Sequence, residues 1–401
     1  MTVWIETSLT DEGDATRAIE RSHAMLDRQA TPQIENDVEW ARAGLAPDVE
    51  SLIVFTLGSP DDITGFAPVW THRSSLGLSA AGKTFGSIGI ERWVSVGGPM
   101  LDADALDERA RSQAAAAFVE TLRGRLGRRG VVFLQGLPEG DAAYELVNGR
   151  DERIRRHYHV LPHGPIYARR FIDLPRTYDA YLAKFSAKTR STFKRKIKKL
   201  GEAAGSVAEL RTYRDSDQID AFLDAAIEVS KTTYQWNFLG IGLRDRARLE
   251  RQCRFAAREG WLRCYVLWSG GAPIAFLYGL VARSTYYYID VGFDPAWSKY
   301  SAGLVLNLLM IEDLITQPGA PKQLDFMYGD MWYKEHLSTR SRMERHFYLI
   351  PRTAWGTSVA ITLRSIDGAV EGSAALLDRL GLKDKIRRLI RRNLAEGDGE
   401  A

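Results

Sequence analysis

The chain has 401 residues, 45% of them hydrophobic and 26% charged, which excludes a largely disordered or fibrous protein and favours two domains. Its net charge of +3 is uneven: 19 basic and 24 acidic side chains give residues 1–170 a charge of −5, whereas 35 basic and 27 acidic ones give residues 171–401 a charge of +8. This modest excess suits a phosphorylated small molecule better than a long nucleic acid. The two cysteines are too few for a disulfide framework or a thiolate metal site, so no metal is expected.

Hydrophobic periodicity predicts an α/β protein in which one series of elements occurs twice. In the first half we expect a helix at 14–29, strands at 51–57, 63–71 and 84–96, a helix at 103–126, a strand at 131–135, a helix at 142–148 and a strand at 154–160. In the second half we expect helices at 187–200, 216–233 and 244–259, strands at 261–268, 273–281 and 285–293, a helix at 301–315, a strand at 323–327, a short helix at 332–337 and a strand at 345–350.

Each half therefore runs strand, strand, strand, helix, strand, helix, strand, which predicts a structural duplication although matched positions share almost no identical residues. Prolines and a glycine interrupt the periodic segments at 161–175 and place the join there. The predicted domains are residues 1–165 and residues 166–352. A helical tail follows over residues 353–401.

The tail ends in a basic amphipathic segment. Its apolar stripe consists of Leu382, Ile386, Leu389, Ile390 and Leu394, with basic residues around it from Lys383 to Arg392. Such a helix can lie on an anionic membrane surface, or it can dock on its own protein with the basic face in solvent. Because the N-terminal region lacks the apolar block of a signal peptide, and no stretch resembles a membrane span, we expect a cytoplasmic protein. Peripheral contact with the inner membrane through residues 383–392 stays open.

The segment from Tyr286 to Leu314 reads YYYIDVGFDPAWSKYSAGLVLNLLMIEDL and predicts a strand, a loop and a helix. The loop region contains Lys299, Ser301 and Gly303, and the first helical turns contain no acid. Backbone N–H groups at a helix N-terminus favour negative charge, and a glycine lets a phosphate approach the backbone. The pattern predicts an anion site, although Ser and Gly at such a turn can also serve capping alone.

Three further runs make the pattern more specific: GAPIAF at 271–276, WSKYSAGLVL at 297–306 and LDFMYGDMWYK at 324–334. As a set they resemble the GNAT N-acyltransferase superfamily, and more narrowly the CelD-like acetyltransferases associated with cellulose and exopolysaccharide synthesis, which are related to the peptidoglycan Fem transferases. The basic run FSAKTRSTFKRKIKKL at 185–200 also matches, so the resemblance covers about residues 178–350. One departure is Tyr328, where an arginine usually precedes the G-D-x-x-Y-K motif.

The resemblance implies a mixed α/β sheet with two tandem GNAT-like domains, of which the second binds acetyl-CoA or another acyl-CoA. The strands at 285–293 and 323–327 would splay apart and hold the pantetheine arm between them. The N–H group of Val291 or Gly292 would polarise the acyl carbonyl. The diphosphate would rest on the turn and helix start formed by Lys299, Tyr300, Ser301, Ala302, Gly303 and Leu304.

Attack of an amine on a thioester needs a base for the amine proton and an acid near the departing sulfur. Asp290 and Asp330 are the candidate bases, and strand alternation predicts Asp290 on the same face as Tyr288. Tyr300 or Tyr333 could protonate the thiolate, because a phenol pKa near 10 suits that transfer. All four also have structural interpretations, since carboxylates cap turns and tyrosines pack in cores or at rims.

Two further segments suggest what else the protein contacts. The polar and aromatic helix end at 230–238 contains the predicted acceptor ligands Tyr234, Gln235 and Trp236, to which Tyr288 and Lys334 are added; packing at the domain junction is the alternative. The run at 184–199 carries eight cations and no acid. It suits the 3′-phosphate of coenzyme A, a nucleotide-sugar or phospholipid acceptor, or tRNA, and equally a solvated surface helix.

We therefore expect transfer of an acyl group, most simply acetyl, to an amine on a sugar, an amino acid or a cell-envelope or exopolysaccharide precursor. The first half is expected to be a degenerate copy that shapes the acceptor cleft, because its loop VSVGGPM at 94–100 contains Pro99, which lacks an N–H donor, and no nearby cation. Two alternatives stay open: an aminoacyl-tRNA-dependent Fem-like transferase, for which tRNA would be the partner, and a non-catalytic scaffold of an exopolysaccharide complex.

Overall fold

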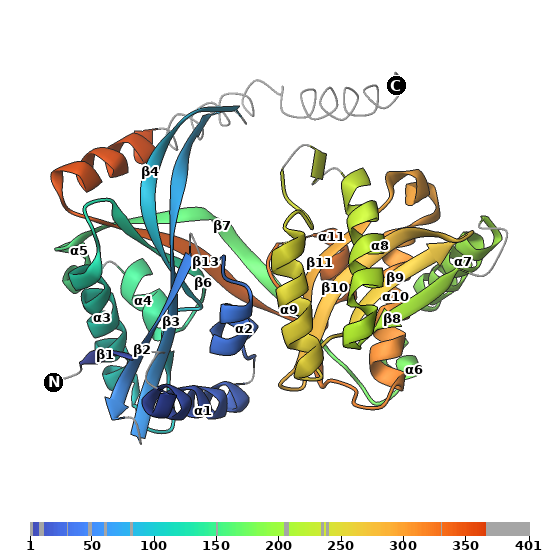
Figure 1. The fold of residues 1–401 in the computed structure, drawn as a ribbon, viewed down its shortest axis with the longest axis horizontal. Helices are drawn as coiled ribbons and strands as arrows, with labels where there is room; N and C mark the ends of the chain where they lie inside the picture. Colours follow the sequence, from blue (N-terminus) through green and yellow to red (C-terminus); the bar gives the residue numbers. More distant parts are fainter. Residues whose placement is uncertain are drawn as a thin grey trace.

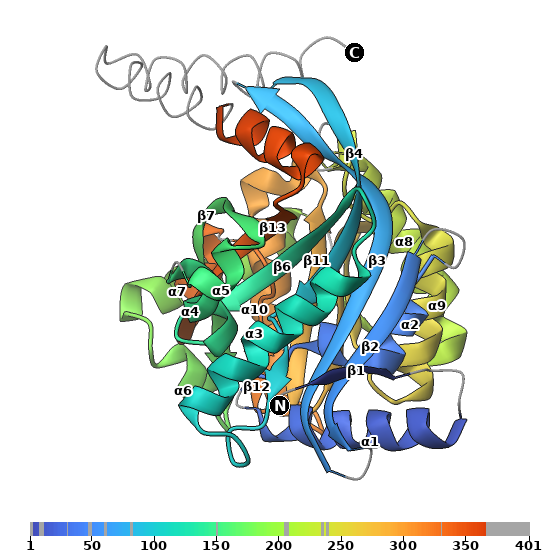
Figure 2. The ribbon, with the colours of Figure 1, turned by 90° about the vertical axis from the view of Figure 1, so that its left-hand side faces the viewer.

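The computed structural model describes residues 3–7, 12–29, 31–46, 50–59, 62–80, 83–149, 151–203, 208–233, 236–237, 240–329 and 331–365. Its first half contains the strands β1 (Trp4–Thr7), β2 (Glu50–Ser59), β3 (Asp62–Ala80), β4 (Lys83–Val96), β5 (Met100–Leu101) and β6 (Gly130–Pro138). The helices of this half are α1 (Glu12–Arg28), the 3-10 helix η1 (Ile34–Asn36), α2 (Val38–Ala43), α3 (Glu108–Arg125), α4 (Ala142–Asn148) and α5 (Glu152–Arg155). In Figure 2, α3 lies across one face of the first-half strands.

After β7 (Tyr158–Asp173), the second half contains the strands β8 (Glu209–Tyr213), β9 (Cys264–Ser269), β10 (Ala272–Ala282), β11 (Thr285–Phe293), β12 (Gln323–Asp325) and β13 (Arg340–Pro351). Its helices are α6 (Tyr178–Leu182), α7 (Ala187–Ala203), η2 (Ser216–Gln218), α8 (Ile219–Thr232), α9 (Arg246–Arg258), η4 (Pro295–Tyr300), α10 (Ala302–Thr316) and α11 (Trp332–Leu337). A further helix covers residues 354–365. It packs on the β3–β4 ribbon, where Val359 belongs to the same apolar cluster as Leu76 and Ile90.

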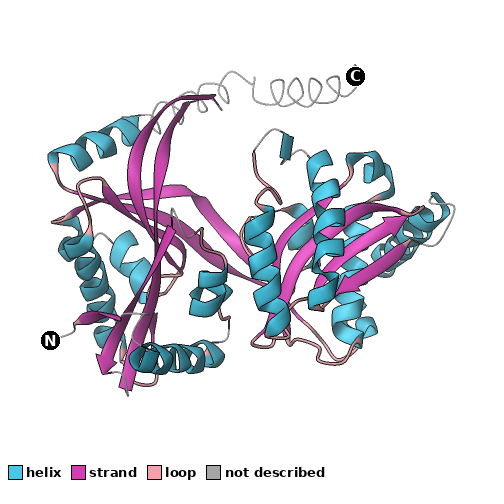
Figure 3. Ribbon diagram, in the orientation of Figure 1, coloured by secondary structure: helices cyan, strands magenta, loops and turns pink. Residues whose placement is uncertain are grey.

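One mixed sheet of 13 strands runs through both halves (Figures 1 and 3). The strand order is β1-β2-β3-β4-β6-β13-β7-β12-β11-β10-β9-β8, and β5 pairs with β3 beside this path. β13 lies between β6 and β7, and β7 pairs with β12 on its other side. The first half of the sheet is thus completed by β13 from the far end of the chain, and β7 joins it to the second half in one hydrogen-bonded unit.

The join between the halves differs from its sequence-based prediction. The sequence predicts an interruption at 161–175, but β7 runs continuously from Tyr158 to Asp173 and pairs with β13 along its length. Gly164 has a φ of +72° and lies where the register of this pairing shifts, between Glu344 and His346. The glycine and prolines are therefore accommodated by a bulge, and the boundary predicted between residues 165 and 166 falls inside it.

Apolar clusters cover both faces of the second-half sheet. One contains Tyr286 and Tyr288 of β11 together with the apolar face of α10. The other packs α8 and α9 on the opposite face and includes Ile34 and Trp40. The segment that carries η1 and α2 therefore belongs to the first half in sequence but is buried against the second.

The predicted mixed α/β fold with two similar halves and a following helix is confirmed, and most elements lie within a few residues of their predicted bounds. β1 and β8 are not predicted because edge strands of 4 and 5 residues are too short for their periodicity to stand out. None of the helices in the described ranges is long and apolar enough to cross a bilayer. The predicted basic segment at 382–394 lies outside those ranges.

Candidate active site

A cavity of about 540 Å³ opens where β11 and β12 separate. The two strands pair in parallel over only three residues, 285–287 with 323–325, and β11 then continues to Phe293 without β12 beside it. Tyr288, Val291 and Gly292 line the cavity from β11, and Tyr328 lines it from the chain that follows β12. The strands therefore separate where the resemblance implied that they would.

The N-terminus of α10 forms another wall of this cavity, to which Ser301, Gly303 and Leu304 contribute. Ser301 has a φ of 60° and gives no side-chain cap, and the first helical bond runs from the N–H of Val305 to the carbonyl of Ser301 at 3.0 Å. Among the described residues, no acceptor contacts the N–H groups of Ala302, Gly303 and Leu304. With no acid in the first turn, these donors suit an anion.

The basic helix α7 brings positive charge to the same loop, because it packs against α10 and η4 (Figure 1). Lys196 lines the cavity. The ammonium groups of Lys199 and Lys299 lie over the Tyr300 ring, 5.7 and 4.9 Å from its centroid. The two sequence segments predicted to contact anions therefore meet at one place. Tyr300, whose ring lies under the ammonium groups of Lys199 and Lys299, does not itself line the cavity.

Lys334 holds open the gap between the strands. Its side chain is 6% exposed, and its Nζ donates to the carbonyls of Phe326 at 2.8 Å and Tyr328 at 2.6 Å. Backbone carbonyls beyond β12 would otherwise need a neighbouring strand, because buried polar groups are costly without a partner. Lys334, predicted to bind the acceptor, does line the cavity, and its bonds to the chain beside it give its position in the G-D-x-x-Y-K motif a structural reason.

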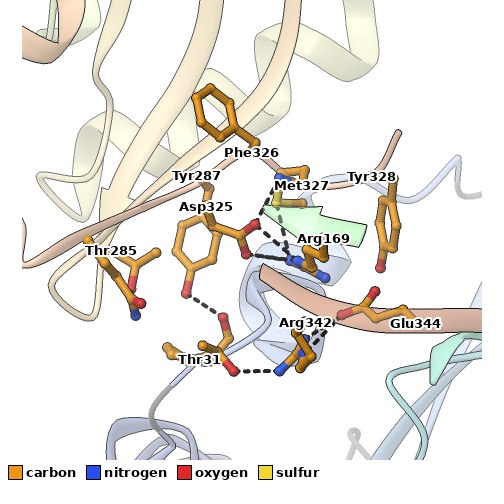
Figure 4. Close-up of polar contacts among 12 residues, drawn as sticks. Thr31, Arg169, Thr285, Tyr287, Asp325, Phe326, Met327, Tyr328, Arg342 and Glu344 are labelled. Atoms are coloured by element: carbon orange, nitrogen blue, oxygen red, sulfur yellow. Dashed lines mark hydrogen bonds and ion pairs between the residues drawn. The ribbon is translucent and has the colours of Figure 1, made fainter. Parts of the chain in front are cut away.

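A buried ion pair fixes the turn that leaves β12 (Figure 4). Arg169 of β7 and Asp325 are at most 1% exposed, and the Arg169 Nε and Nη2 groups donate to the carboxylate at 3.0 and 2.6 Å. Asp325 also accepts the N–H of Met327, whose φ is +55°, and the Tyr328 ring lies 5.1 Å from the guanidinium carbon. Burial alone would lower the pKa of Arg169, but the Asp325 charge raises it well above its usual range.

Arg169 is absent from the sequence-based prediction, and no local pattern could have revealed it. The two partners are 156 positions apart, and only the pairing of β7 with β12 brings them together. Asp325 lies inside the run at 324–334, so its carboxylate was the only part of this pair that the sequence motif contained.

Asp290 is not among the residues that line the cavity, and its orientation differs from the one predicted. A bulge at Ile289 shifts the register between β10 and β11, so that Tyr288 pairs with Gly279 and Asp290 with Tyr278. As a result Val291, and not Asp290, packs in the apolar cluster of Tyr288, which corrects the predicted shared face. The strict alternation assumed from the sequence fails at the bulge.

The Asp290 carboxylate accepts the N–H of Val291 at 2.8 Å. Burial raises its pKa to about 6, although this hydrogen bond and the charge of Lys334 act in the opposite direction. Asp290 is therefore a carboxylate whose protonation changes near neutral pH. The Val291 N–H, one of the two predicted carbonyl donors, is occupied by this carboxylate in the structure.

Polar side chains are also present among the lining residues of the cavity. Tyr288, Asn307 and Tyr333 line it, and the Tyr288 hydroxyl and Asn307 Oδ1 are buried without a hydrogen-bond partner among the described residues. Asn307 Nδ2 donates to the carbonyl of Gly303 at 2.8 Å. Burial raises the pKa of both phenols, so each keeps its proton at neutral pH. The structure thus distinguishes the two predicted acids, because Tyr333 lines the cavity and Tyr300 does not.

The structure describes only some of the residues predicted to bind the acceptor. Tyr234, Gln235 and Asp330 lie outside the described residues. Trp236 packs under the guanidinium of Arg244, 4.3 Å from ring to carbon, and does not line the cavity. Thr233, just before this segment, does line it. No group of three or more potential metal ligands occurs among the residues that the structure describes.

Residues 187–335 match the family model of the acetyltransferase (GNAT) domain. The curated proteins give no match. Among solved structures, FemX aligns with a TM-score of 0.55 and 10% identity over 82% of this chain and 95% of its own. At such identity the likeness concerns the fold alone.

Two other solved structures align with a TM-score of 0.49. One is the C-terminal domain of a putative lysylphosphatidylglycerol synthetase from Agrobacterium fabrum, at 13% identity over 88% of this chain and 95% of its own. The other is a tandem GNAT protein from the clavulanic acid biosynthesis pathway, at 14% identity over 87% of this chain and 98% of its own.

Proposed function

We propose that the second half, which carries a GNAT acetyltransferase domain over residues 187–335, transfers an acyl group from acyl-CoA to an amine. The observation that carries the proposal is the cavity between β11 and β12, whose wall includes the uncapped N-terminus of α10. The simplest acyl group that such a reaction could transfer is acetyl.

The residues present fit acyl-CoA. Three backbone N–H groups, at Ala302, Gly303 and Leu304, have no acceptor among the described residues, and a diphosphate could take them. The cations of Lys196, Lys199 and Lys299 lie beside them, within reach of the 3′-phosphate. The edges of the separated strands suit an extended amide-bearing arm. When bound, the thioester would supply an activated acyl group.

The chain's own residues would handle the protons. Asp290, with a pKa of about 6, is ionised at neutral pH and basic enough to take a proton from an attacking amine. Tyr333, which stays protonated, would give a proton to the departing sulfur. The N–H of Val291 could turn from the Asp290 carboxylate to the acyl oxygen, or Gly292 could serve instead. Asp330 stays a second candidate base.

The acceptor part of the proposal rests on the CelD-like resemblance. We place the amine on a sugar, an amino acid or a cell-envelope or exopolysaccharide precursor, and the protein in the cytoplasm, with residues 383–392 able to contact an anionic membrane. The cations of α7 would also suit an aminoacyl-tRNA donor, which is the competing hypothesis. Both hypotheses use the same cavity and differ in what delivers the acyl group.

The test is a mass-spectrometric screen of amine acceptors with isotopically labelled acetyl-CoA. Amino sugars, amino acids and their nucleotide-linked forms are incubated with the full chain, and labelled products are compared with those of an Asp290→Asn, Tyr333→Phe double variant. A labelled amide that the variant does not form supports the proposal. Transfer from aminoacyl-tRNA alone, or no transfer with acetyl-CoA, contradicts it.

A further inference from the structure

A second cavity, of about 490 Å³, lies in the first half at the place that corresponds to the candidate active site. It lies at the C-terminal ends of β4 and β6 and at the N-terminus of α3. The chain from Gln29 to Asn36 forms another wall, and Arg342 of β13 reaches it from the far end of the chain. The sequence-based expectation of no cation at this place is therefore wrong, because Arg111 and Arg342 both line the cavity.

This cavity does not suit a diphosphate. The Asp107 carboxylate caps α3 by accepting the N–H of Ala110 at 2.7 Å, and Glu108 adds a second acid in the first turn. β4 and β6 stay paired up to Val96 and Gln135, and the N–H of Gly97 donates to the Gln135 carbonyl at 2.8 Å. Neither open strand edges nor an uncapped helix is present here, so the ligand must be of another kind.

Two buried amides in the wall lack partners. Gln33 and Asn36 are 5% and 3% exposed, and no described residue hydrogen-bonds to Gln33 Oε1 or Asn36 Oδ1. Gln33 lies against Gly97, where a Cβ atom would come within 2.5 Å of its Nε2. Buried amides are costly without partners and are normally paired. Both residues line the cavity, but these two oxygens are themselves buried, so the charged groups of the wall decide what the cavity can bind.

The wall that carries these amides is held in place from behind. Tyr287 of β11 donates its hydroxyl to the Pro32 carbonyl at 3.1 Å, and Ile34 is buried in the second-half core. Arg342 bonds to Thr31 and to the Glu344 carboxylate (Figure 4). The wall segment is therefore preformed, which favours a real binding site over a gap between loosely packed chains.

The remaining polar groups carry both signs of charge. Arg111 forms no ion pair within the described residues, and Arg342 supplies a second cation. The carboxyl groups are those of Glu108, Asp141 and Glu145. Burial raises the pKa of Asp141, against the lowering effects of its bond to the Ala143 N–H and of both arginines. No aromatic side chain is among the described residues that line the cavity, so a sugar face or a nucleobase would find no ring to stack on.

We propose that this cavity binds a zwitterionic amino acid or short peptide. Its carboxylate would pair with Arg111, and its ammonium group would lie at Asp141 and Glu145. The site adds a ligand to the protein that acyl transfer does not require, and it stands independently of the function proposed for the second half.

The test is isothermal titration of the full chain, without any acyl-CoA, with single amino acids and dipeptides, each compared with its N-acetylated and C-amidated form. We expect at least one zwitterion to bind and its blocked forms to bind at least ~10-fold more weakly, since each loses a charge-assisted contact. Arg111→Met should weaken binding by a similar factor. Arg109→Met is the matched control, because Arg109 is exposed on the same helix outside the cavity.

Thermal unfolding of both variants shows that they fold, so a loss of binding can be attributed to the side chain. The proposal is overturned if none of the zwitterions binds, if the blocked forms bind equally well, or if Arg111→Met and Arg109→Met weaken binding alike. None of these outcomes depends on whether the second half binds acetyl-CoA.

Discussion

The two halves offer a direct comparison, because each presents a helix N-terminus beside a pair of parallel strands. In the first half, α3 is capped by Asp107 and begins with Glu108, whereas α10 has no side-chain cap and no acid in its first turn. β4 and β6 pair over six residues, but β11 and β12 pair over three. The same topology therefore produces a polar cavity beside paired strands in one half and a cavity between separated strands in the other.

The comparison teaches that a few side chains decide what the repeated frame can bind. In the second half, Lys334 donates hydrogen bonds to carbonyls that would otherwise pair with a neighbouring strand. The Arg169–Asp325 ion pair fixes the turn after β12. In the first half, the Asp107 carboxylate accepts the N–H of Ala110, a donor that a bound anion would need. Removing these groups one at a time tests the comparison.

The largest effect is expected from Arg169→Met, which leaves the buried Asp325 carboxylate unpaired. We expect the free energy of unfolding to fall by about 3–5 kcal/mol, measured by denaturant titration. Arg340→Met is the matched control, because Arg340 pairs with Asp173 at the surface, where an ion pair contributes ~1 kcal/mol or less. Similar losses from both variants would mean that the buried pair does not hold the turn.

Lys334→Met should reduce the free energy of unfolding by about 2–3 kcal/mol, since two buried carbonyls lose a charged donor. It should also weaken acetyl-CoA binding, because the strand edges can then approach each other. Lys322→Met serves as the control, since Lys322 is exposed just before β12. If Lys334→Met left both stability and affinity at the level of this control, the gap between β11 and β12 would not depend on the ammonium group.

The pH dependence of kcat/KM tests whether Asp290 is the base. The pKa of Asp290 is raised from 3.8 to about 6. A base must be ionised, so the rate should increase about tenfold between pH 5 and pH 7 and then level off. Asp290→Asn should lower the rate and remove this rise. A profile that is flat from pH 5 to pH 7 in the unchanged protein would exclude Asp290 as the base.

The smallest effect is expected from Asp107→Ala, which removes the cap of α3 and should cost about 1 kcal/mol of stability in thermal or denaturant unfolding. The first half should still bind no acetyl-CoA, because its strands stay paired. The stoichiometry in calorimetry should remain one acetyl-CoA per chain. A second binding event in this variant would show that the cap alone closes the first half to the cofactor.

The sequence predicted the parts of the site that are local in the chain. The loop from Lys299 to Leu304 and the strand before it are contiguous, so periodicity and composition placed both correctly. The Ile289 bulge was missed because it depends on the register with β10, which one strand's sequence does not contain. The alternation of faces beyond Tyr288 was wrong for the same reason.

The contacts made across long sequence separations could not be predicted. Arg169 meets Asp325, and Arg342 reaches the first-half cavity, only because β7 and β13 cross between the halves of the sheet. Gln33 and Asn36 belong to a polar segment without periodicity, and nothing local shows that they are buried. Local pattern thus placed the loop predicted to bind an anion, whereas the groups beside the gap between β11 and β12 depend on strand order.

The most direct test of the account is calorimetry of acetyl-CoA with the unchanged protein, Gly303→Ala and Gly303→Asp. A Cβ atom at Gly303 would come within 2.9 Å of the Phe293 ring, so the alanine variant measures crowding and the aspartate variant adds a carboxylate at the predicted diphosphate. We predict that Gly303→Asp binds at least ~100-fold more weakly than Gly303→Ala, because like charges meet at the helix N-terminus. Equal affinities in the two variants would contradict the placement of the acyl-CoA site at α10.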